Sequence, residues 1–95
     1  MINNDMPAKG GPAFGGRKVE IYSTASCHFC HLAKEFFVAN SIPFVDYNVG
    51  ADTAKRVEMI DKSGQMGVPV IVIDGKDVVI GFDRDALTKL LASST

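Results

Sequence analysis

The fold of this chain is decided by the stretch VEIYSTASCHFCHLAKEF, residues 19–36. Residues 18–23 alternate apolar and polar side chains, which is the pattern of a strand with one face buried. From residue 27 onward, apolar side chains recur at helical spacing. The strand therefore leads into a helix that opens with Cys27 and Cys30, which are the only two cysteines of the chain.

This placement predicts a reactive dithiol. The first turn of a helix presents unpaired N–H groups and a partial positive charge, and both favour a thiolate over a thiol. Residues three apart lie on one helical face, so the second sulfur can reach the first. We expect Cys27, nearer the helix N-terminus and partly exposed, to be the nucleophile. We expect Cys30, which is less exposed, to resolve the mixed disulfide. The alternative is a pair of inert structural cysteines.

Composition limits the classes of protein. The chain has 95 residues, 46% hydrophobic and 22% charged, which is typical of one globular domain. Its net charge of −1 argues against a nucleic-acid partner. No stretch reaches the length of a membrane span, and residues 1–16 do not resemble a signal peptide. We expect a flexible tail over residues 1–16, one domain over residues 17–95, a monomer and a cytoplasmic location. In that compartment a lone C-x-x-C is catalytic or metal-binding rather than structural.

The remaining pattern predicts the element order β-α-β-α-β-β-α. A strand, a helix and a second strand in succession favour a parallel crossover. Asp74-Gly75 is a tight-turn signal between two strands. After the helix over residues 27–40, we expect a strand at 44–49, a helix at 51–63, strands at 70–73 and 78–80, and a helix capped by Asp83. We expect apolar core or filler roles for Phe36, Phe37, Phe44, Val57, Met59 and Met66.

This order resembles the thioredoxin fold and, in detail, the glutaredoxin family. The matching segments are VEIYSTASCHFCHLAKEF, SGQMGVPVIVIDG and VVIGFDRDAL, in that order. The resemblance implies an α/β fold with a four-stranded mixed sheet flanked by three helices. It also implies a cis peptide bond before Pro69 that exposes the backbone of Val68. A substrate peptide or glutathione would pair with this backbone like an added strand.

Two departures from the family pattern bear on the site. The usual Pro-Tyr between the cysteines is replaced by His28-Phe29. The usual Gly-Gly after the fourth strand is replaced by Gly81-Phe82, followed by Asp83. The Gly-Phe form looks more like the redoxins that donate electrons to ribonucleotide reductase and are recharged by thioredoxin reductase. A bulky Phe82 is expected to crowd glutathione, for which Asp83 could still offer an acceptor. The reductant is therefore either glutathione or a thioredoxin-reductase-type flavoenzyme.

Three further side chains are expected near the sulfurs. The resemblance places Gln65 near the glycyl end of glutathione. A protonated His28 would favour the thiolate of Cys27, whereas the alternative is a solvated residue at the helix start. Phe29 either forms part of an apolar rim around the sulfurs or packs inward. His31 is expected on the surface.

These residues predict a dithiol glutaredoxin-like oxidoreductase that reduces protein or mixed disulfides through Cys27 and Cys30, with no bound cofactor. The alternatives are an iron–sulfur or metal-binding glutaredoxin-like module and a redox sensor without turnover. The segment C-H-F-C-H invites a zinc site, but four ligands cannot converge from one helical turn. We therefore assign no metal ligand.

Overall fold

The computed structural model describes residues 17–92, so the tail predicted over residues 1–16 lies outside the described residues. The predicted element order is confirmed. The elements are β1 (Val19–Ser23), α1 (His28–Ala39), β2 (Val45–Asn48), α2 (Thr53–Ser63), β3 (Val70–Ile73), β4 (Asp77–Ile80) and α3 (Arg84–Ala92). No helix in this part of the chain is long and apolar enough to cross a membrane.

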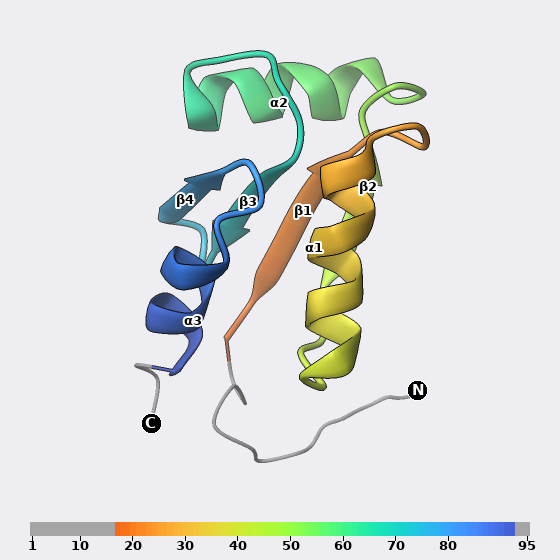
Figure 1. Ribbon diagram of the computed structural model, residues 1–95. Coiled ribbons are helices and arrows are strands. Elements are labelled where there is room, and N and C mark those ends of the chain that lie inside the picture. Colours follow the sequence, from red (N-terminus) through yellow and green to blue (C-terminus); the bar gives the residue numbers. More distant parts are fainter. Residues whose placement is uncertain (1–16, 93–95) are drawn as a thin grey trace, which may run out of the picture.

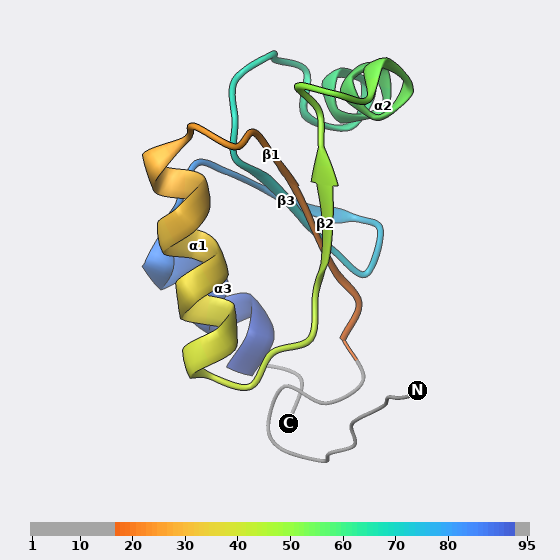
Figure 2. The same ribbon diagram turned by 90° about the vertical axis from the view of Figure 1, so that its right-hand side faces the viewer.

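The strands form one sheet in the order β2-β1-β3-β4, shown in Figure 1. β1 runs parallel to β2 and antiparallel to β3, and β3 runs antiparallel to β4. Figure 2 shows α1 and α3 on one side of this sheet and α2 on the other. The predicted four-stranded mixed sheet with three flanking helices is therefore confirmed.

The two central strands are buried on both faces, and each face has its own core. β3 reads VIVI and is buried throughout, as expected for β-branched residues in a strand covered on both sides. β1 alternates between the faces, with Val19 and Ile21 toward α1 and α3 and Tyr22 toward α2. The core beneath α1 and α3 also contains Phe37, Ile42, Ile71, Ile73, Val79, Leu87 and Leu91, and the core beneath α2 contains Val49, Met59, Val70 and Val72.

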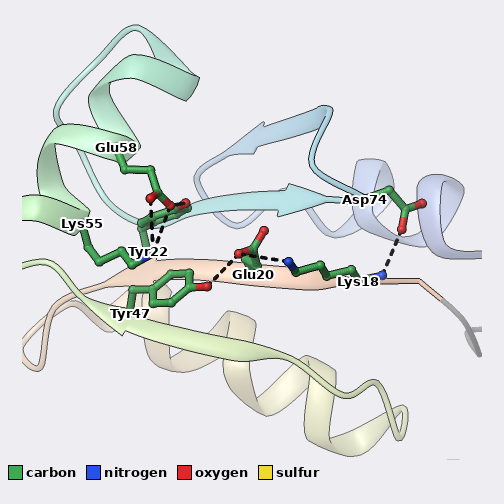
Figure 3. A network of polar contacts seen from close by, with 7 residues as sticks. All are labelled: Lys18, Glu20, Tyr22, Tyr47, Lys55, Glu58 and Asp74. Atoms are coloured by element: carbon green, nitrogen blue, oxygen red, sulfur yellow. Dashed lines mark hydrogen bonds and ion pairs between the residues drawn. The ribbon is translucent and has the colours of Figure 1, made fainter.

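Polar contacts join α2 to the sheet, as Figure 3 shows. The Tyr22 hydroxyl donates to the carboxylate of Glu58 on α2. On β2, the Tyr47 hydroxyl donates to Glu20 Oε2 at 2.7 Å. Lys55 on α2 lies 3.2 Å from Glu58 Oε1 and places its ammonium 4.2 Å from the centre of the Tyr47 ring. The second core therefore has a polar margin built from phenols, carboxylates and an amine.

The predicted core role of Val57 and the predicted gap-filling role of Met66 are wrong. Val57 is 56% exposed, because α2 contacts the sheet through Met59, and residues two apart point to nearly opposite sides of a helix. Met66 is 61% exposed in the loop that follows α2. The predicted core roles of the three phenylalanines are confirmed. Phe37 lies in the core beneath α1, and the partly buried Phe36 and Phe44 pack against it.

The ends of α2 follow its sequence. Asp52 caps the start by accepting a hydrogen bond from the Lys55 N–H at 3.1 Å. Gly64 ends the helix in the left-handed region at φ 74°, where its N–H donates to the Ile60 carbonyl oxygen at 2.7 Å. This turn directs the chain straight into the loop that carries Val68.

Candidate active site

Cys27 caps the N-terminus of α1 with its own side chain. Its backbone is extended, at φ −82° and ψ 114°, and its Sγ accepts a hydrogen bond from the Cys30 N–H at 3.2 Å. The Cys27 N–H donates to the Thr24 carbonyl oxygen at 3.3 Å, which fixes the approach to the helix. A backbone donor and the positive end of a helix both stabilise negative charge on this sulfur. The side chain is only half-buried, as predicted.

Cys30 lies one turn further along α1 and is fully buried at 0% exposure. Both cysteines are free thiols. Burial, together with the hydrogen bond to Cys27, raises the pKa of the Cys30 thiol to about 12. Cys30 therefore keeps its proton at neutral pH. One sulfur of the pair is half-exposed and accepts a backbone hydrogen bond, and the other is buried and keeps its proton.

The loop between α2 and β3 lies against Cys27. The Val68-Pro69 peptide bond is cis, as the resemblance implies, and the Val68 carbonyl oxygen lies 3.9 Å from Cys27 Sγ. The Gly81 N–H donates to the Pro69 carbonyl oxygen at 2.9 Å, which brings the end of β4 to the same place. Within residues 17–92, no protein group accepts a hydrogen bond from the Val68 N–H. The Val68 N–H is therefore available beside the sulfur for an extended segment, whereas the Val68 carbonyl oxygen accepts from the Cys27 thiol.

Two large apolar side chains are exposed on the segments that carry the sulfurs and Val68. Phe29 is 57% exposed on the first turn of α1, so inward packing is wrong. Met66 is exposed two residues before Val68. The His28 ring meets Phe29 edge-on at 5.4 Å, and within the described residues it makes no hydrogen bond to Cys27. Its proposed effect on the thiolate stays a prediction.

His31 has a contact that sequence reasoning missed. It is exposed, as predicted, but its Nε2 lies 2.8 Å from the Ala25 carbonyl oxygen. Because a carbonyl oxygen can only accept, Nε2 carries the proton in this contact. The ring therefore ties the loop before Cys27 to α1. No sequence signal distinguishes such a histidine from a solvated one.

The segment Gly81-Phe82-Asp83 is turned partly toward the core. Gly81 has φ 79°, a left-handed value that glycine adopts without strain. The half-buried Phe82 ring lies 6.0 Å from the ring of Phe36. Asp83 Oδ1 accepts the Ala86 N–H at 3.1 Å and caps α3, as predicted. Contacts of Gly81, Phe82 and Asp83 with glutathione stay predictions.

Gln65 is turned onto its own loop. Its Oε1 accepts the Gly67 N–H at 2.8 Å, and its Nε2 donates to the Gly67 carbonyl oxygen at 2.9 Å. The predicted contact of Gln65 with glutathione is untested. Within residues 17–92, no group of three or more His, Cys, Asp and Glu side chains is placed to hold a metal ion.

Comparisons with known proteins agree with this geometry. A family model described as Glutaredoxin matches residues 19–78. An uncharacterised glutaredoxin-like 8.6 kDa protein in the rubredoxin operon of Clostridium pasteurianum is 44% identical over 73 residues, which cover 77% of this chain and 96% of that protein. Glutaredoxin 3 of Escherichia coli is 38% identical over 60 residues, which cover 63% of this chain and 72% of that protein.

Two solved structures show the same arrangement. The thioredoxin-like protein BC3987 is similar with a TM-score of 0.72 and 33% identity, over 77% of this chain and 99% of that chain. The glutaredoxin-like NrdH-redoxin from Escherichia coli is similar with a TM-score of 0.67 and 25% identity, over 77% of this chain and 93% of that chain. That redoxin is described as having a thioredoxin-like activity profile.

Proposed function

This chain belongs to the glutaredoxin family of thiol–disulfide oxidoreductases, and from that membership we propose that Cys27 is the nucleophile of its Cys27–Cys30 pair and Cys30 the resolving thiol. One observation carries the proposal. The Cys27 sulfur is half-exposed and accepts a backbone N–H at 3.2 Å, whereas the Cys30 side chain is fully buried. Only the first sulfur can meet a substrate disulfide from solvent.

The reaction begins with attack by the Cys27 thiolate on one sulfur of the substrate disulfide. A bond forms between these two sulfurs, the substrate S–S bond breaks, and the second substrate sulfur leaves and takes up a proton. Cys30 then loses its proton and attacks Cys27 Sγ. The Cys27–Cys30 disulfide forms and the remaining substrate thiol is released. Two electrons have passed from the pair to the substrate. Cys30 supplies one of the two protons, and the other comes from solvent, which received the Cys27 proton when the thiolate formed.

Cys30 is held ready for the second step by its surroundings. Besides burial, the hydrogen bond and the charge of Cys27 raise the pKa of the Cys30 thiol. Both contributions from Cys27 disappear once that sulfur is joined to the substrate. Cys30 therefore becomes easier to deprotonate at the stage where its thiolate is required.

The substrates are disulfide-bearing extended segments of proteins. Support comes from the Val68 carbonyl oxygen at 3.9 Å from Cys27 Sγ and from the unpaired Val68 N–H within residues 17–92. A segment that pairs with this backbone brings its own sulfur to Cys27. Exposed Phe29 and Met66 supply apolar surface on the same segments.

A thioredoxin-reductase-type flavoenzyme is the proposed reductant of the oxidised pair. Two observations support this choice: the Gly81-Phe82 sequence, and the similarity to a redoxin that is described as having a thioredoxin-like activity profile. The test compares recycling by thioredoxin reductase with NADPH against recycling by glutathione with glutathione reductase. Faster recycling by glutathione would overturn this choice and leave the roles of the two sulfurs intact.

The roles of the sulfurs are tested by two serine variants in an insulin-reduction assay. Cys27→Ser is expected to abolish turnover. Cys30→Ser is expected to stop at a stable mixed disulfide on Cys27, visible by mass spectrometry. Ser26→Ala, an exposed change next to the nucleophile, is the matched control and should retain wild-type turnover. Wild-type turnover by Cys27→Ser would show that the nucleophile lies elsewhere.

A further inference from the structure

In the loop before Val68, the Gln65 side chain forms the two hydrogen bonds that a neighbouring strand would form with one residue. The Gln65 amide accepts the Gly67 N–H at 2.8 Å and donates to the Gly67 carbonyl oxygen at 2.9 Å. One side-chain amide thus binds both backbone groups of one residue, as a neighbouring strand would. We call this pair of hydrogen bonds the Gln65–Gly67 clamp. It lies one residue before Val68.

The start of the same loop is fixed by Ser63. Its hydroxyl donates to the Met59 carbonyl oxygen at 2.7 Å and lies 2.9 Å from the Gln65 carbonyl oxygen. The Gln65 N–H lies 3.3 Å from the same hydroxyl oxygen. Met59 is the fully buried residue of α2, so Ser63, the last residue of that helix, is tied to a residue of the core beneath α2. The clamp continues this support from Gln65 toward Val68.

Among the described residues and apart from its chain neighbours, only the Gln65 side chain would lie within 4 Å of a Cβ atom at residue 67. A Cβ atom at residue 67 would stand 2.9 Å from Gln65 Oε1, closer than such contacts occur in proteins. The Gln65 amide, the far end of a flexible side chain, would have to shift, and the shift would strain both hydrogen bonds of the clamp. A glycine at this position therefore has a steric reason that does not depend on an unusual backbone angle.

We propose that Gln65 is a positioning residue, which holds the loop so that the Val68 backbone faces Cys27, and that the glycyl carboxylate of glutathione is not its ligand. Releasing the amide to a ligand would break two hydrogen bonds that shape the substrate platform. The proposal rests on the proposed function, because it takes the Val68 backbone as the surface that substrates pair with. It predicts that Gln65 affects protein disulfides and glutathione alike.

The experiment measures two quantities on Gln65→Ala: amide hydrogen exchange at Gly67 and turnover of insulin and of glutathione disulfide. Loss of the clamp should speed Gly67 exchange about tenfold, since two hydrogen bonds together contribute about 1.4 kcal/mol or more. The KM should rise for both substrates with little change in kcat. Gly67→Ala should have the same effects, and the double variant should add nothing further.

Asn40→Ala is the matched control. The Asn40 amide also donates to a backbone carbonyl, that of Phe36, at 2.8 Å, and it is also exposed. It lies at the far end of α1 from Cys27. Its loss should cost similar stability without changing Gly67 exchange or either KM. The control separates positioning of the loop from a general loosening of the fold.

Each outcome decides the proposal. Unchanged Gly67 exchange in Gln65→Ala would overturn the clamp. Faster exchange with unchanged insulin turnover would overturn the positioning role. A rise in KM for glutathione disulfide alone would make Gln65 a glutathione ligand. Failure of the proposed function would show separately, as turnover retained by Cys27→Ser, and Gly67 exchange would then decide the clamp by itself.

Discussion

The two faces of the sheet hold the two halves of the active site by different means. Under α1 and α3 the packing is apolar, and polar contacts lie at its margin, where Asp46 accepts from Ser23 at 2.6 Å and from Lys34 at 2.8 Å. Under α2 the apolar core is smaller, and hydrogen bonds to carboxylates lie beside it. Tyr22 donates to Glu58 on α2, and Tyr47 donates to Glu20 on β1. α1 carries both sulfurs, and α2 leads into the Val68 loop.

The difference teaches how each half responds to its surroundings. Burial of apolar surface is insensitive to pH and is not weakened by salt. Hydrogen bonds to carboxylates and ion pairs depend on protonation and ionic strength. Helix α1, which carries the sulfurs, should therefore stay in place at pH values and salt concentrations that loosen the Val68 loop.

The largest effect is expected from the apolar face. Phe37→Ala removes a fully buried ring that packs against Phe36 and Phe44, and it should lower the free energy of unfolding by about 3–5 kcal/mol. Urea denaturation measures the change. Val38→Ala, at a neighbouring residue that is 70% exposed, should cost less than about 0.5 kcal/mol. A cost below about 2 kcal/mol for Phe37→Ala would contradict an apolar anchor for α1.

A smaller effect is expected from the polar face. Tyr22→Phe keeps the buried ring and removes the hydroxyl that donates to Glu58, so we expect a loss of about 1–2 kcal/mol in urea denaturation. Glu58 retains Lys55 at 3.2 Å, which limits the loss. If Tyr22→Phe lowered the free energy of unfolding as much as Phe37→Ala does, the two faces would not differ in how they are stabilised.

Alkaline pH should weaken the polar face. The hydrogen bond to Glu20, with burial, raises the pKa of Tyr47 to about 12, and burial together with Glu58 raises the pKa of Tyr22 above its ordinary value. A raised pKa gives stability that is complete below the ordinary value of 10.0 and is lost as pH rises toward about 12. The free energy of unfolding should therefore fall above pH 10.

Tyr22→Phe sharpens this test. The variant should lose less stability between about pH 10 and pH 12 than the wild type does, because one titrating phenol is gone. The buried Cys30 thiol, whose pKa is also raised, is present in both proteins and cancels from the comparison. Equal alkaline losses in the two proteins would show that Tyr22 plays no part.

The smallest effect is expected from Lys55→Met, which removes the ion pair with Glu58 and the contact with the Tyr47 ring. We expect a cost of about 0.5–1 kcal/mol that shrinks as salt is added, because the amine is partly exposed. Arg56→Met, an exposed change on the same helix, is the control and should cost less. A cost that does not vary with salt would argue against an electrostatic role for Lys55.

Local signals predict most of the fold. Alternation marks β1, the β-branched run marks β3, and Asp52 and Gly64 mark the ends of α2. The failures come from tertiary packing. A helix that lies alone across a sheet buries a narrow stripe, and the sequence does not say whether Val57 or Met59 faces inward.

Much of the site also follows from the sequence, because the positions of Cys27 and Cys30 depend only on the helix start. The resemblance adds the cis peptide before Pro69, which the structure confirms. The contacts of Gln65 and His31 are beyond the sequence. Whether a side chain binds its own backbone or faces outward depends on a loop shape that no local pattern specifies.

The sealing of Cys30 beneath a half-open Cys27 has a practical consequence for thiol counting. A bulky alkylating reagent added to the native reduced protein would modify Cys27 and leave Cys30 unmodified until the chain is unfolded in denaturant. A disulfide reagent would register both thiols, because Cys30 expels the reagent from its mixed disulfide with Cys27. Surveys that label native proteins by alkylation would thus count one reactive cysteine in this protein, although it has two.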